Sequence, residues 1–88
     1  VDVLRLDGRV VIVTGASRGI GAAVARIAAG LGAHIVGVAR SADAVRSVIA
    51  ELPTESHAVV GDVADPAVAE EALEAAARLG RVWGLVNN

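Results

Sequence analysis

The chain has 88 residues, 55% of them hydrophobic and 20% charged, so it is long enough for one domain and too apolar to be intrinsically disordered. A formal net charge of −2 without a basic cluster argues against nucleic acid as a partner, and no apolar run approaches the ~20 residues that a membrane-spanning helix needs. The absence of cysteine and of a signal-peptide pattern at the N-terminus predicts a cytoplasmic location.

The first predicted element is a strand over Val10–Val13, because a continuous β-branched run is typical of a strand buried on both faces in a parallel sheet. Gly15 ends this strand. A helix is predicted from Ile20, and Gly32 follows it at the position where a left-handed residue commonly ends a helix. Apolar residues at helical spacing predict its buried stripe, which consists of Ile20, Val24, Ile27, Ala28 and Leu31.

A second strand and helix follow. The apolar run Ile35–Val38 predicts the strand, and Ser41 is a suitable N-cap for the helix after it. Pro53 ends this helix, because the residue before a proline is disfavoured in the helical conformation. The predicted buried stripe consists of Val45, Val48, Ile49 and Leu52.

The last predicted elements are a strand over Ala58–Val60, a helix over Pro66–Leu79 and a strand over Val82–Val86. Asp65 supplies an N-cap oxygen, and a proline at the first helical position suits the start of a helix. Regular alternation of strands and helices with short loops predicts an α/β fold, a doubly wound parallel sheet of order 3-2-1-4. Residues 1–88 would form one domain at most, and we expect them to be part of a larger one.

The segment Thr14–Gly21, between the first strand and the first helix, carries three glycines. Gly15 suits a tight turn, Gly19 permits a ligand to approach the backbone, and Gly21 permits close packing of the helix on the strand. The free N–H groups and the positive dipole end of the helix favour a phosphate group. The segment therefore predicts binding of a dinucleotide pyrophosphate. Glycines that only turn the chain are the alternative.

Other phosphate-binding loops fit this segment less well. A Walker A loop requires a lysine, and the chain contains none. The Gly-x-Gly-x-x-Gly fingerprint fails because Val24 occupies the place of its third glycine. A methyltransferase-like domain is disfavoured because Thr14 stands where those loops usually have an acidic residue. The observed spacing is Thr-Gly-x-x-x-Gly-x-Gly.

With this spacing the chain resembles the short-chain dehydrogenases/reductases, which have a Rossmann-type fold. Gly61-Asp62-Val63 looks like the family's adenine-contacting Asp-Val, and Val86-Asn87-Asn88 looks like the start of its Asn-Asn-Ala-Gly segment. The resemblance covers essentially the whole chain and implies that the family's catalytic Ser and Tyr-x-x-x-Lys lie beyond Asn88. We therefore expect a truncated, N-terminal cofactor-binding part with no catalytic residue, which transfers no hydride by itself because it has neither Tyr nor Lys.

The resemblance also implies roles for single residues. Gly21 would mainly permit packing, Asp62 would accept a hydrogen bond from the adenine amino group, and the Val63 main chain would contact the adenine ring. Asn88 would lie near the nicotinamide ribose. Asp62 as a turn residue and Asn88 as a hydrogen-bonding group at the sheet end are the alternatives. The pyrophosphate and the adenosine ribose would lie among Gly15, Ser17, Arg18, Gly19 and Ile20.

A further expectation concerns the two strand ends that flank the glycine segment. The resemblance implies that Thr14 ties the first strand to the Asn87–Asn88 end of the fourth strand. Because the fourth strand would be an outer strand of the sheet, we also expect Trp83 to be partly exposed and the chain to self-associate or to be only marginally folded.

The residues after the second strand predict which nicotinamide cofactor binds. An acidic residue there binds the ribose 2′-hydroxyl of NAD, whereas an arginine accepts the 2′-phosphate of NADP. This chain has Ala39 and Arg40, and Arg18 would lie on the opposite side of the same ribose. NADP is therefore favoured over NAD. The alternative is that Arg40 is a solvated charge in the loop and does not select the cofactor, with Asp43 the only acidic residue nearby.

The implied function is an NADP(H)-dependent oxidoreductase that interconverts a small-molecule carbonyl and an alcohol, as a homo-oligomer in the intact protein. The alternative is a non-catalytic dinucleotide-binding or interaction module that is complete at 88 residues. No metal site is expected, because His34 and His57 have no partners at metal-ligand spacing.

Overall fold

The computed structural model describes residues 5–88. Strands and helices alternate throughout this part of the chain, and every predicted element is present with its ends within two residues of the prediction. The elements are β1 (Arg9–Thr14), α1 (Gly19–Gly30), β2 (His34–Ala39), α2 (Ala42–Ala50), β3 (His57–Val60), α3 (Pro66–Leu79) and β4 (Arg81–Val86).

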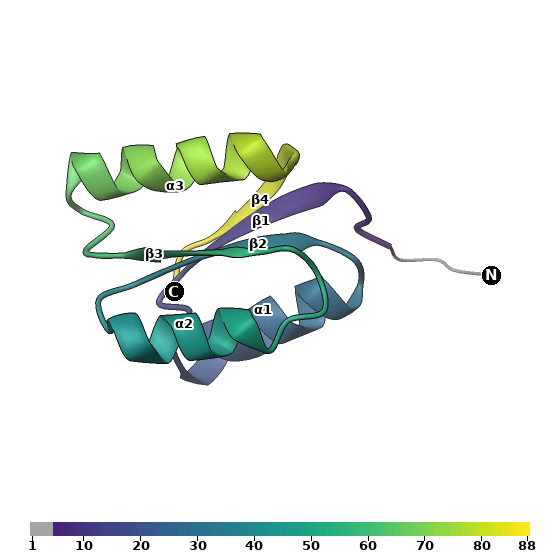
Figure 1. Cartoon of the computed structure of the whole chain (residues 1–88), viewed down its shortest axis with the longest axis horizontal. Helices are drawn as coiled ribbons and strands as arrows, with labels where there is room; N and C mark the ends of the chain where they lie inside the picture. The colour runs from purple at the N-terminus through teal and green to yellow at the C-terminus, as the bar shows by residue number, and fades with distance from the viewer. Residues whose placement is uncertain (1–4) are drawn as a thin grey trace.

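The four strands form one parallel sheet of order β3-β2-β1-β4, which confirms the predicted fold. Figure 1 shows α3 on one face of this sheet and α1 and α2 on the other. This arrangement follows from right-handed crossovers, because the chain moves from β1 outward to β3 and then returns across the sheet to β4. All four strands therefore end at the same edge.

Apolar side chains fill both faces of the sheet. Val13 and Ile35 are fully buried under α1 and α2, while Val10, Val36 and Val59 are fully buried under α3. Burial on both faces explains why these strands are continuous aliphatic runs and do not alternate with polar residues. Within residues 5–88, no helix has the length and the apolar character needed to cross a membrane.

The buried face of α1 differs from the prediction. Ile20 and Ile27 were expected in the core, but their side chains are 72% and 66% exposed. Helix α1 lies on the sheet through its smallest residues, which allow its backbone to approach the strands closely. The buried residues of α1 are Gly21, Ala22, Ala25, Ala28 and Ala29.

The stripe predicted for α2 is confirmed, because Val45 and Val48 are buried and Ile49 and Leu52 are partly buried against the core. In α3, Ala72 and Ala76 are buried at helical spacing, and Val68 and Leu79 are partly buried against the core. In α2 the large apolar residues form a single stripe, so helical periodicity was sufficient to identify its buried side. In α3 the buried residues are alanines, while the larger Leu73 is 59% exposed.

The helix N-termini differ in how they are capped. The Asp65 carboxylate accepts a hydrogen bond of 3.0 Å from the Ala67 N–H, and Pro66 is the first helical residue of α3, as predicted. Ser41 occupies the N-cap position of α2, but its hydroxyl makes no capping hydrogen bond. The hydroxyl of Ser41 is therefore available for another partner.

The pairing of β1 with β4 contains one irregularity. Val10 lies opposite Val82, but the next residue, Val11, lies opposite Gly84. Trp83 is thus an extra residue on β4, as in a β-bulge, and its side chain is 55% exposed. The expected partial exposure of Trp83 is confirmed.

Candidate functional site

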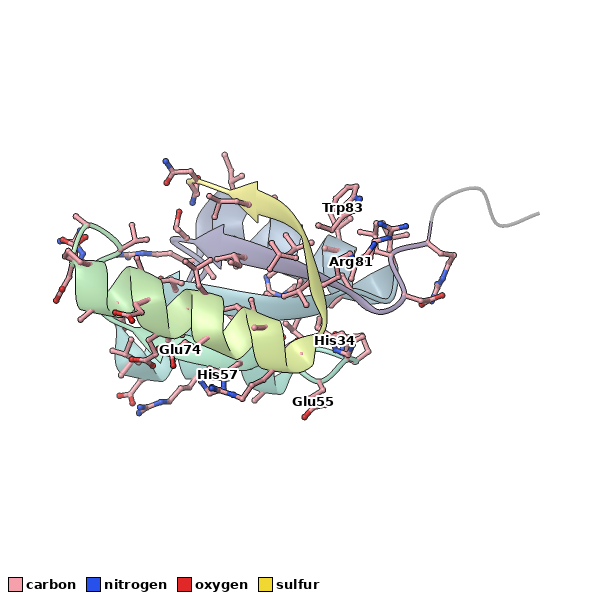
Figure 2. The ribbon with its side chains drawn as sticks, turned by 90° about the horizontal axis from the view of Figure 1, so that it is seen from above. His34, Glu55, His57, Glu74, Arg81 and Trp83 are labelled. Carbon is pink, nitrogen blue, oxygen red and sulfur yellow. The ribbon has the colours of Figure 1, made fainter. Side chains whose placement is uncertain are left out.

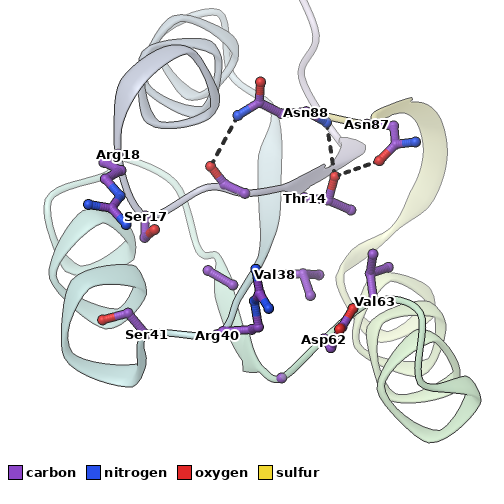
Figure 3. Close-up of a pocket in the computed structure, with 13 residues that line it drawn as sticks. Thr14, Ser17, Arg18, Val38, Arg40, Ser41, Asp62, Val63, Asn87 and Asn88 are labelled. Atoms are coloured by element: carbon purple, nitrogen blue, oxygen red, sulfur yellow. Dashed lines mark hydrogen bonds between the residues drawn. The ribbon is translucent and has the colours of Figure 1, made fainter.

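A cleft of about 660 Å³ lies at the edge where the four strands end. Figure 3 shows the residues that line it, which come from the carboxyl ends of the strands and from the segments just after them. Ligands of open α/β sheets usually bind at this edge, where neighbouring crossovers run in opposite directions. The lining residues are Thr14, Gly15, Ser17, Arg18, Val38, Ala39, Arg40, Ser41, Gly61, Asp62, Val63, Asn87 and Asn88.

Most of the predicted site residues meet in this cleft. The seven that line it are Gly15, Ser17, Arg18, Arg40, Asp62, Val63 and Asn88. Gly19, Ile20 and Gly21 do not line it. Gly19 begins α1 with a φ of +61°, Ile20 points to the surface, and Gly21 is buried beneath the turn at Gly15. Cofactor contacts from all ten residues remain a prediction.

The turn after β1 requires glycine at two positions. Gly15 has a φ of +65°, which an L-residue with a side chain rarely adopts. A Cβ atom on Gly21 would overlap the carbonyl oxygen of Gly15. The two glycines therefore let the start of α1 lie directly against the turn, as the sequence predicted, and the helix N-terminus faces the cleft edge.

Thr14 joins the ends of β1 and β4. Its hydroxyl, in a residue only 4% exposed, donates to Asn87 Oδ1 at 3.0 Å and accepts from the Asn88 N–H at 3.0 Å. The Asn88 side-chain amide donates to the Gly15 carbonyl at 3.4 Å. The predicted tie between Thr14 and the Asn87–Asn88 segment is therefore present, and it fixes one wall of the cleft.

We expect Thr14→Val to lower the free energy of unfolding by about 1–3 kcal/mol, because the change leaves the Asn88 N–H without its acceptor in a partly buried position. Thr14→Ser keeps the hydroxyl and is the matched control, for which a smaller loss is expected. Urea denaturation of the two variants and the unaltered chain measures the difference. Equal losses for Val and Ser would assign the effect to the methyl group and contradict the role of the hydroxyl.

Two arginines line the cleft near the end of β2. Figure 3 shows Arg18 with Ser17 at the glycine turn and Arg40 with Ser41 after β2. Neither Arg18 nor Arg40 forms an ion pair with another residue in the range 5–88. Two guanidinium groups and two hydroxyls thus surround this part of the cleft, and such a group of donors suits an anionic oxygen cluster such as a phosphate.

Asp62 lines the same cleft, in the segment that follows β3. Its Oδ1 atom accepts a hydrogen bond of 2.9 Å from the Ala64 N–H, so Asp62 is a turn residue, as the alternative interpretation held. Its second carboxylate oxygen is left to accept from a ligand, and Val63 beside it is 41% exposed. The turn and the predicted contact with an adenine amino group are therefore compatible.

Six residues of the cleft had no assigned ligand contact in the sequence analysis, namely Thr14, Val38, Ala39, Ser41, Gly61 and Asn87. All six lie at or just after the carboxyl end of a strand, and this position is the signal that could have found them. A Cβ atom on Gly61 would come within 2.5 Å of Val68, so this glycine also permits the close packing of α3.

The two histidines lie outside the cleft. His34, at the start of β2, has its Nδ1 atom 2.7 Å from the Glu55 carbonyl oxygen, and His57 begins β3. No group of three potential metal-ligating side chains occurs within residues 5–88. At the surface, the hydrogen bond from Arg5 lowers the pKa of Asp7, and this pair also lies outside the cleft.

Comparison with known proteins agrees with the geometry of the cleft. Residues 9–88 match the family model described as short chain dehydrogenase. The chain is 38% identical over 86 residues to the 3-oxoacyl-[acyl-carrier-protein] reductase of Escherichia coli strain K12, covering 97% of this chain and 35% of that protein. It is 44% identical over 88 residues to the D-threitol dehydrogenase of Mycolicibacterium smegmatis, covering 96% of this chain and 34% of that protein.

A solved structure shows the same similarity in three dimensions. A metagenomic short-chain oxidoreductase in complex with NADP superimposes with a TM-score of 0.80 and 41% identity, over 94% of this chain and 39% of that chain. The present chain thus spans about a third of the length of the curated relatives that it matches.

Proposed function

Because the chain belongs to the short-chain dehydrogenase family, we propose that it is the dinucleotide-binding part of an NADP(H)-dependent oxidoreductase. The bound nicotinamide would supply the hydride that is exchanged with a substrate carbon, interconverting a carbonyl and an alcohol. The relatives named above act on 3-oxoacyl and polyol substrates, so we propose this general class of reaction and no single substrate.

The proposed preference for NADP over NAD rests on the cationic part of the cleft. Arg18 and Arg40 have no ion-pair partner within residues 5–88, and the residue at the end of β2 is the uncharged Ala39. A 2′-phosphate would receive charge-assisted hydrogen bonds from the two guanidinium groups, whereas the 2′-hydroxyl of NAD would meet no carboxylate at position 39. The NADP complex of a structural neighbour supports this proposal.

The rest of the cleft fits the remaining parts of the same dinucleotide. The pyrophosphate would lie at the N-terminus of α1, next to Gly15 and Ser17, where free N–H groups and the helix dipole favour negative charge. The adenine would lie between Asp62 and Val63 and the end of β2. Asn88, held by Thr14, would face the nicotinamide ribose. The chain's own residues would thus bind and orient the cofactor.

Calorimetric titration of the 88-residue chain with NADPH and, separately, with NADH tests this proposal. We expect NADPH to bind about 10- to 100-fold more tightly, which is the effect of one or two charge-assisted hydrogen bonds. Equal affinities would contradict the choice of NADP and leave dinucleotide binding intact. No binding of either cofactor by the folded chain would contradict the dinucleotide site itself.

A further inference from the structure

The cationic part of the cleft has two walls that belong to different segments of the chain. One wall is the turn after β1, which carries Ser17 and Arg18, and the other is the segment after β2, which carries Arg40 and Ser41. Figure 3 shows these four side chains on the two segments. Because a charge-assisted hydrogen bond requires about 2.7–2.9 Å between donor and acceptor, the distance between the walls decides whether both guanidinium groups reach one phosphate.

Gly37, a buried residue of β2, lies beneath both walls. A Cβ atom on Gly37 would come within 3.1 Å of the Ala16 Cβ atom, which belongs to the turn. It would also come within 3.1 Å of the Ile49 Cδ1 atom and 3.4 Å of the Val45 Cγ2 atom, both on α2. Carbon atoms pack best at about 3.5–4.0 Å, so the turn and α2 both occupy space that a side chain at position 37 would need.

Ala16 connects Gly37 with the first wall. Ala16 is fully buried, and its Cβ atom is fixed to the backbone, so it cannot rotate away from a new neighbour. The Ala16 N–H donates to the Val38 carbonyl at 3.3 Å, beside the hydrogen bond of 2.8 Å from the Gly15 N–H to the same oxygen. Arg18 follows Ala16 by two residues, so a displacement of Ala16 from β2 also displaces Arg18.

Val45 connects Gly37 with the second wall. Val45 is fully buried on α2, and its N–H donates to the Ser41 carbonyl at 3.0 Å. Ser41 is the N-cap residue, so this is the first hydrogen bond of the helix. Arg40 directly precedes Ser41. A displacement of Val45 from β2 is therefore transmitted through one hydrogen bond to the segment that carries Arg40.

We propose that Gly37 is a positioning residue, which sets the distance between the two walls and thereby the preference for NADP over NAD. Gly37 does not itself line the cleft, and the inference rests on the proposed function. Because protein interiors are close-packed, an added methyl group at position 37 must push the turn, α2 or both away from β2, which changes the distance between the walls. NADH and NADPH share every group except the 2′-phosphate, so only NADPH needs both arginines at once.

Calorimetric titration of Gly37→Ala with NADPH and, separately, with NADH tests the proposal. We expect the affinity for NADPH to fall at least about tenfold and that for NADH to fall less than about threefold, because one arginine loses its contact with the 2′-phosphate. Gly84→Ala is the matched control, since Gly84 is also a strand glycine and a Cβ atom on it would meet no atom beyond its chain neighbours within 4 Å. Gly84 lies next to Trp83, which Figure 2 shows pointing away from the sheet, and this control should leave the ratio of the two affinities unchanged.

Changes at Ala16 separate a positioning role from a general loss of stability. Ala16→Gly added to Gly37→Ala removes the fixed Cβ atom from the crowded contact and is expected to restore most of the affinity ratio. Ile49→Val added to Gly37→Ala removes only the Cδ1 atom at the end of a flexible side chain, so a smaller recovery is expected. Ala16→Gly alone adds no atom and loosens the turn, so it should lower the ratio about threefold or more even if Gly37→Ala does not fold. Urea denaturation measures the stability of every variant.

Three results would overturn the proposal. Equal weakening of NADPH and NADH binding by Gly37→Ala would show that Gly37 supports the cleft as a whole and does not select the cofactor. An unchanged affinity ratio in folded Gly37→Ala would remove Gly37 from cofactor selection, while the unaltered chain's preference for NADPH would leave the proposed function intact. Equal affinities of the unaltered chain for the two cofactors would contradict the choice of NADP, and the positioning role would fail with it.

Discussion

The double variant Ala39→Asp, Arg40→Ala is expected to bind NADH more tightly than NADPH. The change supplies a carboxylate that accepts a hydrogen bond from the 2′-hydroxyl of NADH and repels a 2′-phosphate. It also removes one of the two guanidinium groups in the cationic part of the cleft. Each charge-assisted contact has an expected effect of about 1.5–3 kcal/mol, so the ratio of the two affinities should change by at least about 100-fold.

Calorimetric titrations with both cofactors measure this reversal. Arg40→Ala alone should weaken NADPH about tenfold or more and leave NADH nearly unchanged, because only NADPH carries the 2′-phosphate. Arg46→Ala is the control, since Arg46 is an exposed arginine of α2 that does not line the cleft. If Arg46→Ala and Arg40→Ala weaken NADPH binding equally, a general charge effect explains the result. The proposed contact between Arg40 and the 2′-phosphate is then wrong.

Gly21→Ala is expected to destabilise the chain by about 3 kcal/mol or more, at the upper end of what overpacking usually produces. The new Cβ atom would overlap the Gly15 carbonyl oxygen and would also meet the Asn88 side-chain nitrogen at 3.0 Å. The first of these contacts is with backbone, which cannot rotate away as a flexible side chain can. Relief would require α1 to move off the turn that borders the cleft.

Gly30→Ala in the same helix is the matched control. Outside its own helical turn, a Cβ atom on Gly30 would meet no atom within 4 Å, and the φ of Gly30 is not in the left-handed region. We expect Gly30→Ala to be neutral or to stabilise the chain by up to about 1 kcal/mol, because alanine favours the helix. Denaturant unfolding and cofactor titration should therefore separate the two variants. Similar stabilities would show that α1 is not seated tightly on the Gly15 turn.

The order of the elements and the topology of the sheet were predictable because they depend on local signals. Aliphatic runs identify strands buried on both faces, and Asp65 with Pro66 marks the start of α3. Right-handed crossovers then leave few possible strand orders. Position after the second strand identified Arg40, the glycine spacing identified the turn after β1, and the family resemblance identified Asp62.

The buried face of α1 and the register of β4 were not predictable from the same signals. Helix α1 has two apolar faces, one of small residues and one that includes Ile20 and Ile27, and only the sheet opposite decides which is buried. The register shift at Trp83 depends on how β1 and β4 pair, and neither strand specifies it alone. Ser41 was interpreted as a cap, because a sequence does not show whether a hydroxyl turns toward its helix or away.

The hydrogen bonds around Gly15 have a consequence for the thermodynamics of ligand binding. The Gly15 N–H donates to the Val38 carbonyl of β2 at 2.8 Å, and its own carbonyl accepts from Asn88 beyond β4. One residue thus connects the end of β1 with both neighbouring strands. The turn loses its conformational entropy when the chain folds, so little further ordering is needed when a ligand arrives. Such preorganisation makes the affinity of the cleft depend on the stability of the sheet beneath it.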